Sequence, residues 1–175
     1  NKKNQTLKET YIEALQSYNK KDFKKAEIFC YKILSIDPNH IDSISLLATI
    51  FAVHRNFEKA KELMLQAIDI QPKNIKYLNN LGAAYLELGN LKEAINVYEK
   101  ILEIDPKHTN AHYNLGVAFY KLKELKTAKS YFQKTVNIQE NYALAFFSLA
   151  NVHVDLKELK DAISCYQKAI EINPN

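Results

Sequence analysis

Few residues of the chain have the types and spacing that catalysis or metal binding requires. His108 and His112 are four positions apart, which suits two zinc ligands on one helix face, but His108 falls in a predicted turn and no third ligand accompanies the pair. The sequence has no glycine-rich phosphate loop, no HExxH or GxSxG motif, and no carboxylate pair in a plausible cleft. We therefore predict no catalytic residue, no metal site and no cofactor, and a protein that is not an enzyme.

The residues best suited to a binding role are two asparagines, Asn80 and Asn114, whose positions differ by 34. A primary amide carries both donors and an acceptor, so it can hydrogen-bond the backbone of an extended peptide. Asparagine is frequent throughout this chain, so base composition is the competing explanation.

The prolines repeat at the same interval, which indicates the elements that position these side chains. Pro38, Pro72 and Pro106 are 34 apart, Pro174 lies twice 34 beyond Pro106, and Glu140 stands at the skipped position. A fixed period of this length is typical of stacked repeat proteins. We predict a lead-in at residues 1–6 and a single domain of five repeats at 7–40, 41–74, 75–108, 109–142 and 143–175.

Each repeat reads as two amphipathic helices joined by a tight turn. In residues 75–108, the first helix carries Leu78, Leu81, Gly82 and Tyr85 on one face, and the second carries Ala94, Tyr98 and Ile101. Gly89 suits a left-handed helix end, and Asn90 with Glu93 has the spacing of a capping box. Two sites of the repeat always hold a small residue, because overpacking between crossing helices costs about 1–3 kcal/mol. The residues at the first site are Ala14, Ala48, Gly82, Gly116 and Ala150, and those at the second are Ala26, Ala60, Ala94, Ala128 and Ala162.

The first repeat departs from this pattern in its first helix. Thr10, Glu13 and Ser17 stand at sites that are mostly apolar elsewhere, and an apolar stripe shifted by one residue remains, at Tyr11, Ala14, Leu15 and Tyr18. A terminal repeat has no preceding helix to pack on, so we predict that the polar residues form the outer face of an end cap.

This pattern resembles the tetratricopeptide repeat, in which a large residue, Leu-Gly and Tyr are followed by Ala, an aromatic residue and Pro over about 34 residues. The resemblance covers residues 7–175, with Thr135 and Glu140 as local departures. It implies an all-α, right-handed superhelical solenoid of about ten helices in antiparallel pairs. It also implies that the first helices line a concave groove that binds a peptide or an extended protein segment.

Within that implied fold, the groove is lined by aromatic, aliphatic and amide side chains with little charge. The predicted partner-binding residues are Tyr11, Leu15, Tyr18, Ser45, Thr49, Asn79, Asn80, Ala83, Tyr113, Asn114, Val117, Tyr120, Phe147, Ser148 and Asn151. Asn80 and Asn114 resemble the asparagine ladder in the repeat arm of O-linked N-acetylglucosamine transferases. The related clamp for chaperone tails needs paired basic residues, and no window of three repeats supplies two, which argues against that role.

The primary prediction is therefore a non-catalytic protein–protein interaction module. One alternative is the substrate-recruiting arm of a larger bacterial enzyme, such as a glycosyltransferase or sulfotransferase, since the Lys-, Asn- and Ile-rich composition resembles that of AT-rich bacteria. Another is a self-assembling scaffold, because Ile163, Ala169 and Ile170 lie on a face that nothing after Pro174 would cover. That face predicts end-to-end association or a longer parent chain.

Composition and charge bear on location and on other partners. The net charge is +4, and the densest basic cluster, Lys20, Lys21, Lys24 and Lys25, reads as a solvated helix start rather than a nucleic-acid site. No stretch is long and apolar enough for a membrane span. Cys30 and Cys165 lie about four repeats apart, so we expect no disulfide. These features predict a cytoplasmic protein that neither binds nucleic acid nor inserts into membranes.

Overall fold

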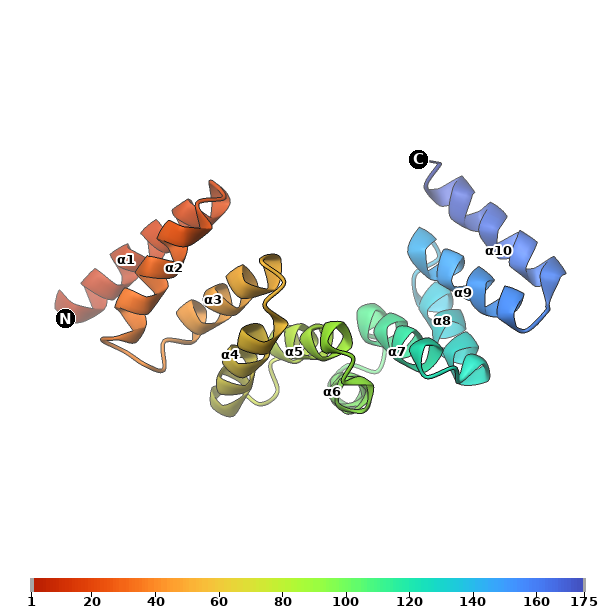
Figure 1. Ribbon diagram of the computed structural model, residues 1–175, viewed down its shortest axis with the longest axis horizontal. Helices are drawn as coiled ribbons and strands as arrows, with labels where there is room; N and C mark the ends of the chain where they lie inside the picture. The colour runs from red at the N-terminus through yellow and green to blue at the C-terminus, as the bar shows by residue number, and fades with distance from the viewer. Residues whose placement is uncertain (1, 175) are drawn as a thin grey trace. The chain divides into compact units, whose positions relative to one another are not determined.

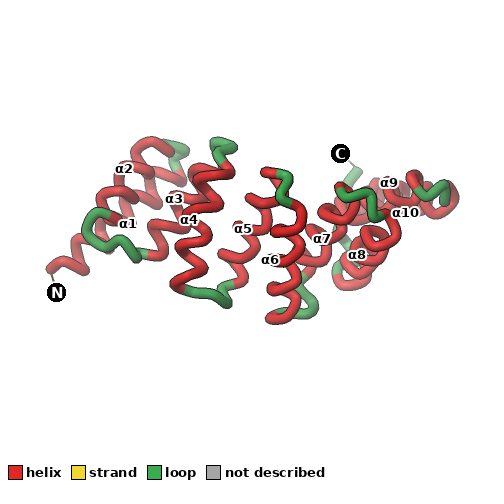
Figure 2. The backbone as a smooth tube through the Cα atoms, turned by 60° about the horizontal axis from the view of Figure 1, so that its bottom comes forward, coloured by secondary structure: helices red, strands yellow, loops and turns green. Residues whose placement is uncertain are grey.

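The computed structural model describes residues 2–174, and over that range the chain is built of ten α-helices and contains no strand (Figure 1; Figure 2). The helices are α1 (Lys2–Asn19), α2 (Phe23–Leu34), α3 (Ile41–Val53), α4 (Phe57–Ile70), α5 (Ile75–Leu88), α6 (Leu91–Ile104), α7 (Thr109–Lys121), α8 (Leu125–Ile138), α9 (Ala143–Asp155) and α10 (Leu159–Ile172). From α3 onward the first helix of each repeat begins at the first position of that repeat, which confirms the predicted period.

The helices form two compact units, which divide between Leu88 and Gly89. In the first unit α1 packs on α2, α2 on α3, α3 on α4, and α4 on α5. In the second unit α6 packs on α7, α7 on α8, α8 on α9, and α9 on α10. The helices α1 and α2 run antiparallel, as do α9 and α10 (Figure 1). Each unit is thus a stack of amphipathic helices that bury their apolar stripes against the next helix in sequence.

A left-handed residue joins the two helices of every repeat. Gly89 has φ 77°, as its sequence context predicts, and the four positions related to it by the repeat period are also left-handed. These positions hold side chains with Cβ atoms: Lys21 (φ 61°), Arg55 (φ 58°), Lys123 (φ 63°) and Lys157 (φ 63°). The left-handed conformation costs a residue with a Cβ about 1–2 kcal/mol, so packing of the flanking helices imposes it there.

The caps that start the second helices differ among repeats. The Asp22 carboxylate accepts from the Lys25 amide at 3.1 Å, and Asn56 accepts from the Lys59 amide at 3.3 Å. Asn90 has the same backbone conformation, but its side chain makes no capping hydrogen bond, so the predicted capping box with Glu93 is wrong. Because the backbone permits the cap, the difference lies in the side-chain rotamer alone.

The turn into the last repeat is unaffected by Glu140. The residue after α8, Gln139, has φ −131° and ψ 93°, and its counterpart Asp105 after α6 has φ −132° and ψ 92°. Both turns are followed by a helix that starts at the same distance along the chain. Proline is therefore compatible with this extended link but is not required to form it.

The structure corrects the expected outer face of α1. Thr10 and Ser17 are buried, not solvated: each hydroxyl donates to the carbonyl of the residue four before it, at 2.8 Å. That bond satisfies a small polar side chain inside the α1–α2 contact. Glu13, the third residue predicted for this face, is exposed, and so are Glu9 and Gln16.

The small residues at the helix crossings lie in the cores, as predicted. The alanines at both sites are at most 3% exposed. Gly116 lies at a close crossing, because a Cβ built there would lie 2.6 Å from Cε1 of Phe132. Thr135, another departure from the pattern, is buried and donates to the carbonyl of Tyr131 at 2.9 Å.

Candidate functional site

Each unit has its own candidate surface, formed by α1, α3 and α5 in the first unit and by α7 and α9 in the second, and all fifteen predicted partner-binding residues lie on these helices. On α1, Tyr11, Leu15 and Tyr18 are half-buried and pack on the core of the first unit. The ring of Tyr11 lies 5.6 Å from that of His40, and the ring of Tyr18 lies 5.5 Å from that of Phe23. Each of these side chains is partly exposed to solvent, and the rest of it packs against the core.

Ser45 and Asn79 offer a partner little polar surface. Ser45 is 5% exposed, and its carbonyl accepts from the Thr49 hydroxyl at 2.9 Å, which directs the Thr49 side chain along the helix. The Oδ1 atom of Asn79 is buried without a hydrogen-bond partner among the described residues.

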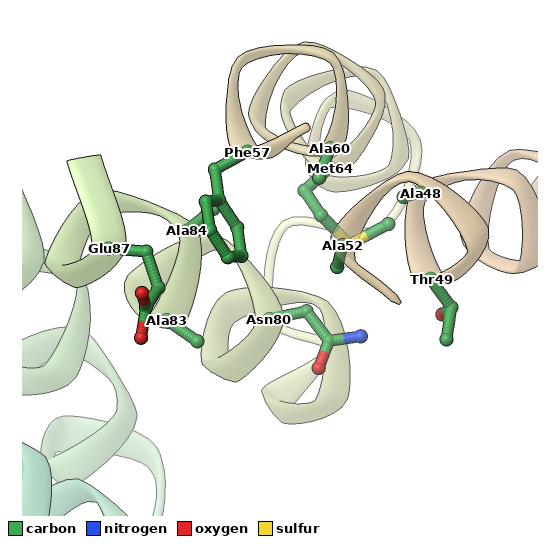
Figure 3. A pocket seen from close by; sticks show the side chains of 10 residues that line it. All are labelled: Ala48, Thr49, Ala52, Phe57, Ala60, Met64, Asn80, Ala83, Ala84 and Glu87. Carbon is green, nitrogen blue, oxygen red and sulfur yellow. The ribbon is translucent and has the colours of Figure 1, made fainter. Parts of the chain in front are cut away.

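A pocket of about 140 Å³ in the first unit brings together three predicted residues from two helices, α3 and α5 (Figure 3). Its lining residues are Ala48, Thr49 and Ala52 of α3; Phe57, Ala60 and Met64 of α4; and Asn80, Ala83, Ala84 and Glu87 of α5. Five alanines create the space, since each removes side-chain volume where the three helices meet. Sequence analysis found Thr49, Asn80 and Ala83 but not the contributions of Phe57, Met64 and Glu87.

The polar groups of this pocket lie beside an apolar wall. Met64 is 1% exposed and lines the same pocket as Asn80, so the Asn80 amide stands beside a thioether that can supply no strong hydrogen bond. Glu87 approaches Arg55 at 3.9 Å, with both side chains at least half exposed, which is a weak ion pair. Asn80 and Glu87 are therefore available to a bound molecule.

On the corresponding surface of the second unit, polar side chains hydrogen-bond one another. The Tyr120 hydroxyl donates to Asp155 Oδ2 at 2.7 Å, and the Tyr166 hydroxyl donates to Asn151 Oδ1 at 2.6 Å. The hydrogen bond to Asp155 raises the pKa of Tyr120 above its usual value, because the carboxylate stabilises the protonated hydroxyl. Asp155 and Asn151 of α9 thus accept hydrogen bonds from a tyrosine of α7 and a tyrosine of α10, respectively.

Four further predicted residues of this unit lie on the same helices. Tyr113 and Ser148 have their hydroxyl oxygens 3.3 Å apart, and Tyr113 also packs against Tyr142 with ring centroids 5.2 Å apart. Phe147 is half exposed beside Tyr166, and Val117 is half-buried against the core.

Asn114 differs from Asn80 in its surroundings. Burial raises the pKa of the Tyr98 hydroxyl, and the nearby Asn114 amide acts in the opposite direction. The two groups do not reach ordinary hydrogen-bond geometry, so the Tyr98 hydroxyl has no full partner among the described residues. Asn114 thus lies near the buried Tyr98 hydroxyl, whereas Asn80 lines a pocket with Met64.

The histidines singled out by spacing have structural contacts. His108 is the N-cap of α7, and its Nδ1 accepts from the Ala111 amide at 3.2 Å. His112 is buried, and its Nε2 donates to the Pro106 carbonyl at 2.9 Å. The position of His108 in the turn between repeats is confirmed.

A third histidine belongs to a charged cluster that the sequence did not indicate. His153 Nδ1 lies 2.5 Å from Glu158 Oε2, and Lys129 Nζ lies 2.6 Å from the same oxygen. Asp161 stands near His153 and Glu158. Hydrogen bonds from Lys129 and then from His153 lower the pKa of Glu158, because both donors stabilise the carboxylate. No local motif signals it, since Lys129 comes from the preceding repeat.

The two ends of the array differ in character. On α10, Leu159, Ile163 and Ile170 are each more than half exposed, whereas Val136, the counterpart of Ile170 on α8, is 4% exposed because α9 packs there. The face of α1 that corresponds to the packed face of α9 carries Glu9, Glu13 and Gln16. Stacking α1 of one copy on α10 of another would desolvate two carboxylates, so the geometry disfavours end-to-end association of that kind.

Among the described residues, no helix has the length and apolar content that crossing a membrane requires. Cys30 is buried and Cys165 half-buried, and both are free thiols.

Comparison with known proteins identifies the repeat. Models described as TPR repeat or tetratricopeptide repeat match residues 84–123, 109–142 and 143–175, which together span more than half of the chain. The model of anaphase-promoting complex, cyclosome, subunit 3 matches residues 19–101. No curated protein shows significant sequence similarity to the chain.

Solved structures with this fold have low sequence identity to the chain. A crystal structure of MamA has a TM-score of 0.85 at 20% identity, over 92% of this chain and 94% of that one. PilF of Pseudomonas aeruginosa has a TM-score of 0.83 at 21% identity, over 99% and 79%. YrrB, described as a TPR protein with an unusual peptide-binding site, has a TM-score of 0.78 at 20% identity, over 95% and 86%. With its regular repeat period and ten helices over residues 2–174, the chain belongs to the tetratricopeptide repeat family.

Proposed function

We propose that the chain is a non-catalytic interaction module that binds an extended segment of a partner protein along the surface of its first helices. The observation that carries this proposal is the pocket between α3, α4 and α5, in which an apolar floor is bordered by an amide and a carboxylate without strong internal partners. Binding sites typically combine an apolar hollow with a few convergent polar groups.

The physical logic favours an extended segment over a small molecule. Helix surfaces expose no free backbone donors, so a peptide backbone must be held by side chains, and the Asn80 amide can donate to one carbonyl and accept from one amide. The half-buried rings of Tyr11 and Tyr18 lose little conformational freedom on binding because they are already packed on the core. The described peptide-binding site of YrrB, which shares the fold, agrees with this proposal.

A selection experiment tests the proposal even though the partner is unidentified. Random peptides displayed on phage are selected on the immobilised chain, and synthetic copies of the selected peptides are measured by calorimetry. Ala83 is exposed in the pocket, so we expect Ala83→Glu to weaken binding at least about tenfold by placing a charge against an apolar ligand.

The matched control is Gln66→Glu, which adds the same charge at an exposed site of α4 that does not line the pocket. Equal effects of the two variants, or peptides that bind both with unchanged affinity, would place the binding surface elsewhere.

A second candidate function is self-association, which the exposed apolar residues of α10 favour. Because the α1 face is acidic, the contact would pair α10 with α10 of a second copy. Analytical ultracentrifugation should then show a dimer that Ile163→Glu dissociates, and a monomer at all concentrations would contradict it.

A further inference from the structure

The pocket of the first unit has a counterpart two repeats further along. Nine of its ten lining positions hold a different residue there, and only Ala60 is matched by the same residue, Ala128. Ala52 of the pocket corresponds to Tyr120, Ala83 to Asn151, and Glu87 to Asp155. Both sites are built from a first helix, its second helix and the next first helix, so the backbone framework is shared.

In the second unit a tyrosine stands at one of these corresponding positions. Tyr120 is half-buried between α7 and α9, and its hydroxyl donates to Asp155 at 2.7 Å. In the first unit the position of that tyrosine holds Ala52, and the acidic acceptor is kept as Glu87. The first unit therefore keeps an acidic acceptor at this place but lacks the tyrosine that donates to it in the second unit.

The open space has the size and chemistry for one aromatic ring. A cavity of about 150 Å³ holds a benzene molecule, and this pocket measures about 140 Å³. Ala48, Ala60 and Met64 are buried in its wall, and Phe57 adds an aromatic face from α4 (Figure 3). Aromatic rings pack favourably edge to face and against sulfur.

We propose that this pocket receives a single tyrosine side chain from an extended segment of a partner protein, with the tyrosine hydroxyl donating to Glu87 and the Asn80 amide binding the segment's backbone. This inference rests on the proposed function and names its ligand class. Arg55, the present neighbour of Glu87, is exposed at 3.9 Å and is displaced at little cost.

The pocket contains a unique reporter, because Met64 is the only methionine in the sequence. Selective ¹³C labelling of methionine methyl groups gives one internal signal, from the wall of the pocket. The probes are short Gly/Ser/Lys peptides that are identical except for one central Tyr, Phe, Ala or Asp. We expect the Met64 signal to shift with the Tyr and Phe peptides, and the Tyr peptide to bind roughly tenfold more tightly than the Ala peptide.

Three variants test the separate parts of the site. Ala52→Tyr copies the second unit and should abolish the Met64 shift by filling the pocket; Ala83→Leu, at an exposed position, fills it without risk to the core. Glu87→Ala should remove the preference for Tyr over Phe, which we expect to be about threefold to tenfold. Asp155→Ala, the same change in the second unit, should leave both peptides' affinities unchanged.

The outcomes separate this inference from the proposed function. Equal affinities for the Tyr and Ala peptides, or a Tyr preference that survives both Ala52→Tyr and Ala83→Leu, overturn the tyrosine pocket. If phage-selected peptides still bind but leave the Met64 signal unmoved, the pocket inference fails and the proposed function stands. If no selected peptide binds any part of the chain, the proposed function fails as well.

Discussion

Gly116 offers the sharpest test of how packing is arranged in the second unit. An added Cβ would lie 2.6 Å from Cε1, 2.7 Å from Cδ1 and 3.0 Å from Cζ of Phe132. Carbon atoms in contact prefer about 3.5–4.0 Å, so the ring edge would have to move by roughly 1 Å. Phe132 is 1% exposed and packs against Tyr113, which leaves it no free direction.

The expected magnitude follows from two opposing terms. Overpacking of a core costs about 1–3 kcal/mol. Replacing glycine by alanine within a helix returns about 1 kcal/mol of propensity. We therefore expect Gly116→Ala to lower the free energy of unfolding by about 1 kcal/mol net.

The second repeat supplies the compensating change. Its small site holds Ala48 and its aromatic site holds Met64, which together line one wall of the pocket. Methionine is flexible and fills irregular space, so Phe132→Met should make room for the new methyl group. In the double variant Gly116→Ala/Phe132→Met we expect the combined destabilisation to be at least about 1 kcal/mol smaller than the sum of the single effects.

The assay is equilibrium unfolding in urea followed by far-ultraviolet circular dichroism. Gly89→Ala is the control: a Cβ there meets nothing within 4 Å, so its cost comes only from the positive φ and should not depend on residue 132. Additivity of Gly116→Ala and Phe132→Met within about 0.5 kcal/mol would refute the steric account.

Three other predictions concern the backbone, the amides and the cysteines. Lys123→Gly should raise the free energy of unfolding by about 1 kcal/mol in urea titrations, because Lys123 has a left-handed backbone conformation. Gly89→Lys should lower the free energy of unfolding by a similar amount. If neither variant changes it, the flanking helices impose no backbone strain. Asn114→Ala should lower the free energy of unfolding by about 1–2 kcal/mol, because the buried Tyr98 hydroxyl loses its polar neighbour. Asn80→Ala should change the free energy of unfolding by less than about 0.5 kcal/mol. If thermal unfolding shows the larger loss for Asn80→Ala, the environments assigned to the two asparagines are wrong. Burial raises the pKa of Cys30 to about 12 from its usual 9.0, so a thiol reagent near neutral pH should label the half-buried Cys165 first and Cys30 only on unfolding, as read by mass spectrometry. Because the pKa of Cys30 is higher in the folded than in the unfolded state, the thiol's contribution to stability is fully present below pH 9 and is lost as the pH rises toward 12. If the stability difference between the parent chain and Cys30→Ala stays constant over that interval, this coupling is absent.

Much of the fold follows from local sequence patterns. Helix positions recur with the repeat period because each amphipathic stripe and each helix-ending signal is a property of a short segment. The burial of Ala26 and its counterparts was predictable for the same reason, since a small residue at a fixed place on an apolar stripe marks a close crossing. Left-handed Lys21 and Arg55 were not, because only a glycine such as Gly89 signals that conformation locally.

The candidate site was predictable only in outline. Sequence analysis placed Thr49, Asn80 and Ala83 on one surface, and the structure brings them into one pocket with Phe57 and Met64. The difference between Asn80 and Asn114 had no sequence signal at either residue, because it depends on Met64 or Tyr98 in the preceding repeat. The polar residues of α1 show the same limit: Thr10 and Ser17 look solvated until their own helix carbonyls are seen to satisfy them.

The sequence by itself thus determined the repeat, its period and the helix faces, because these depend on residues within one or two turns of each other. Only the tertiary structure decided that side chains of three helices leave a pocket beside Glu87 in the first unit, and that Tyr120 donates to Asp155 in the second. Whether a space is open depends on the summed volumes of side chains from three helices, and no single segment of the chain contains that sum.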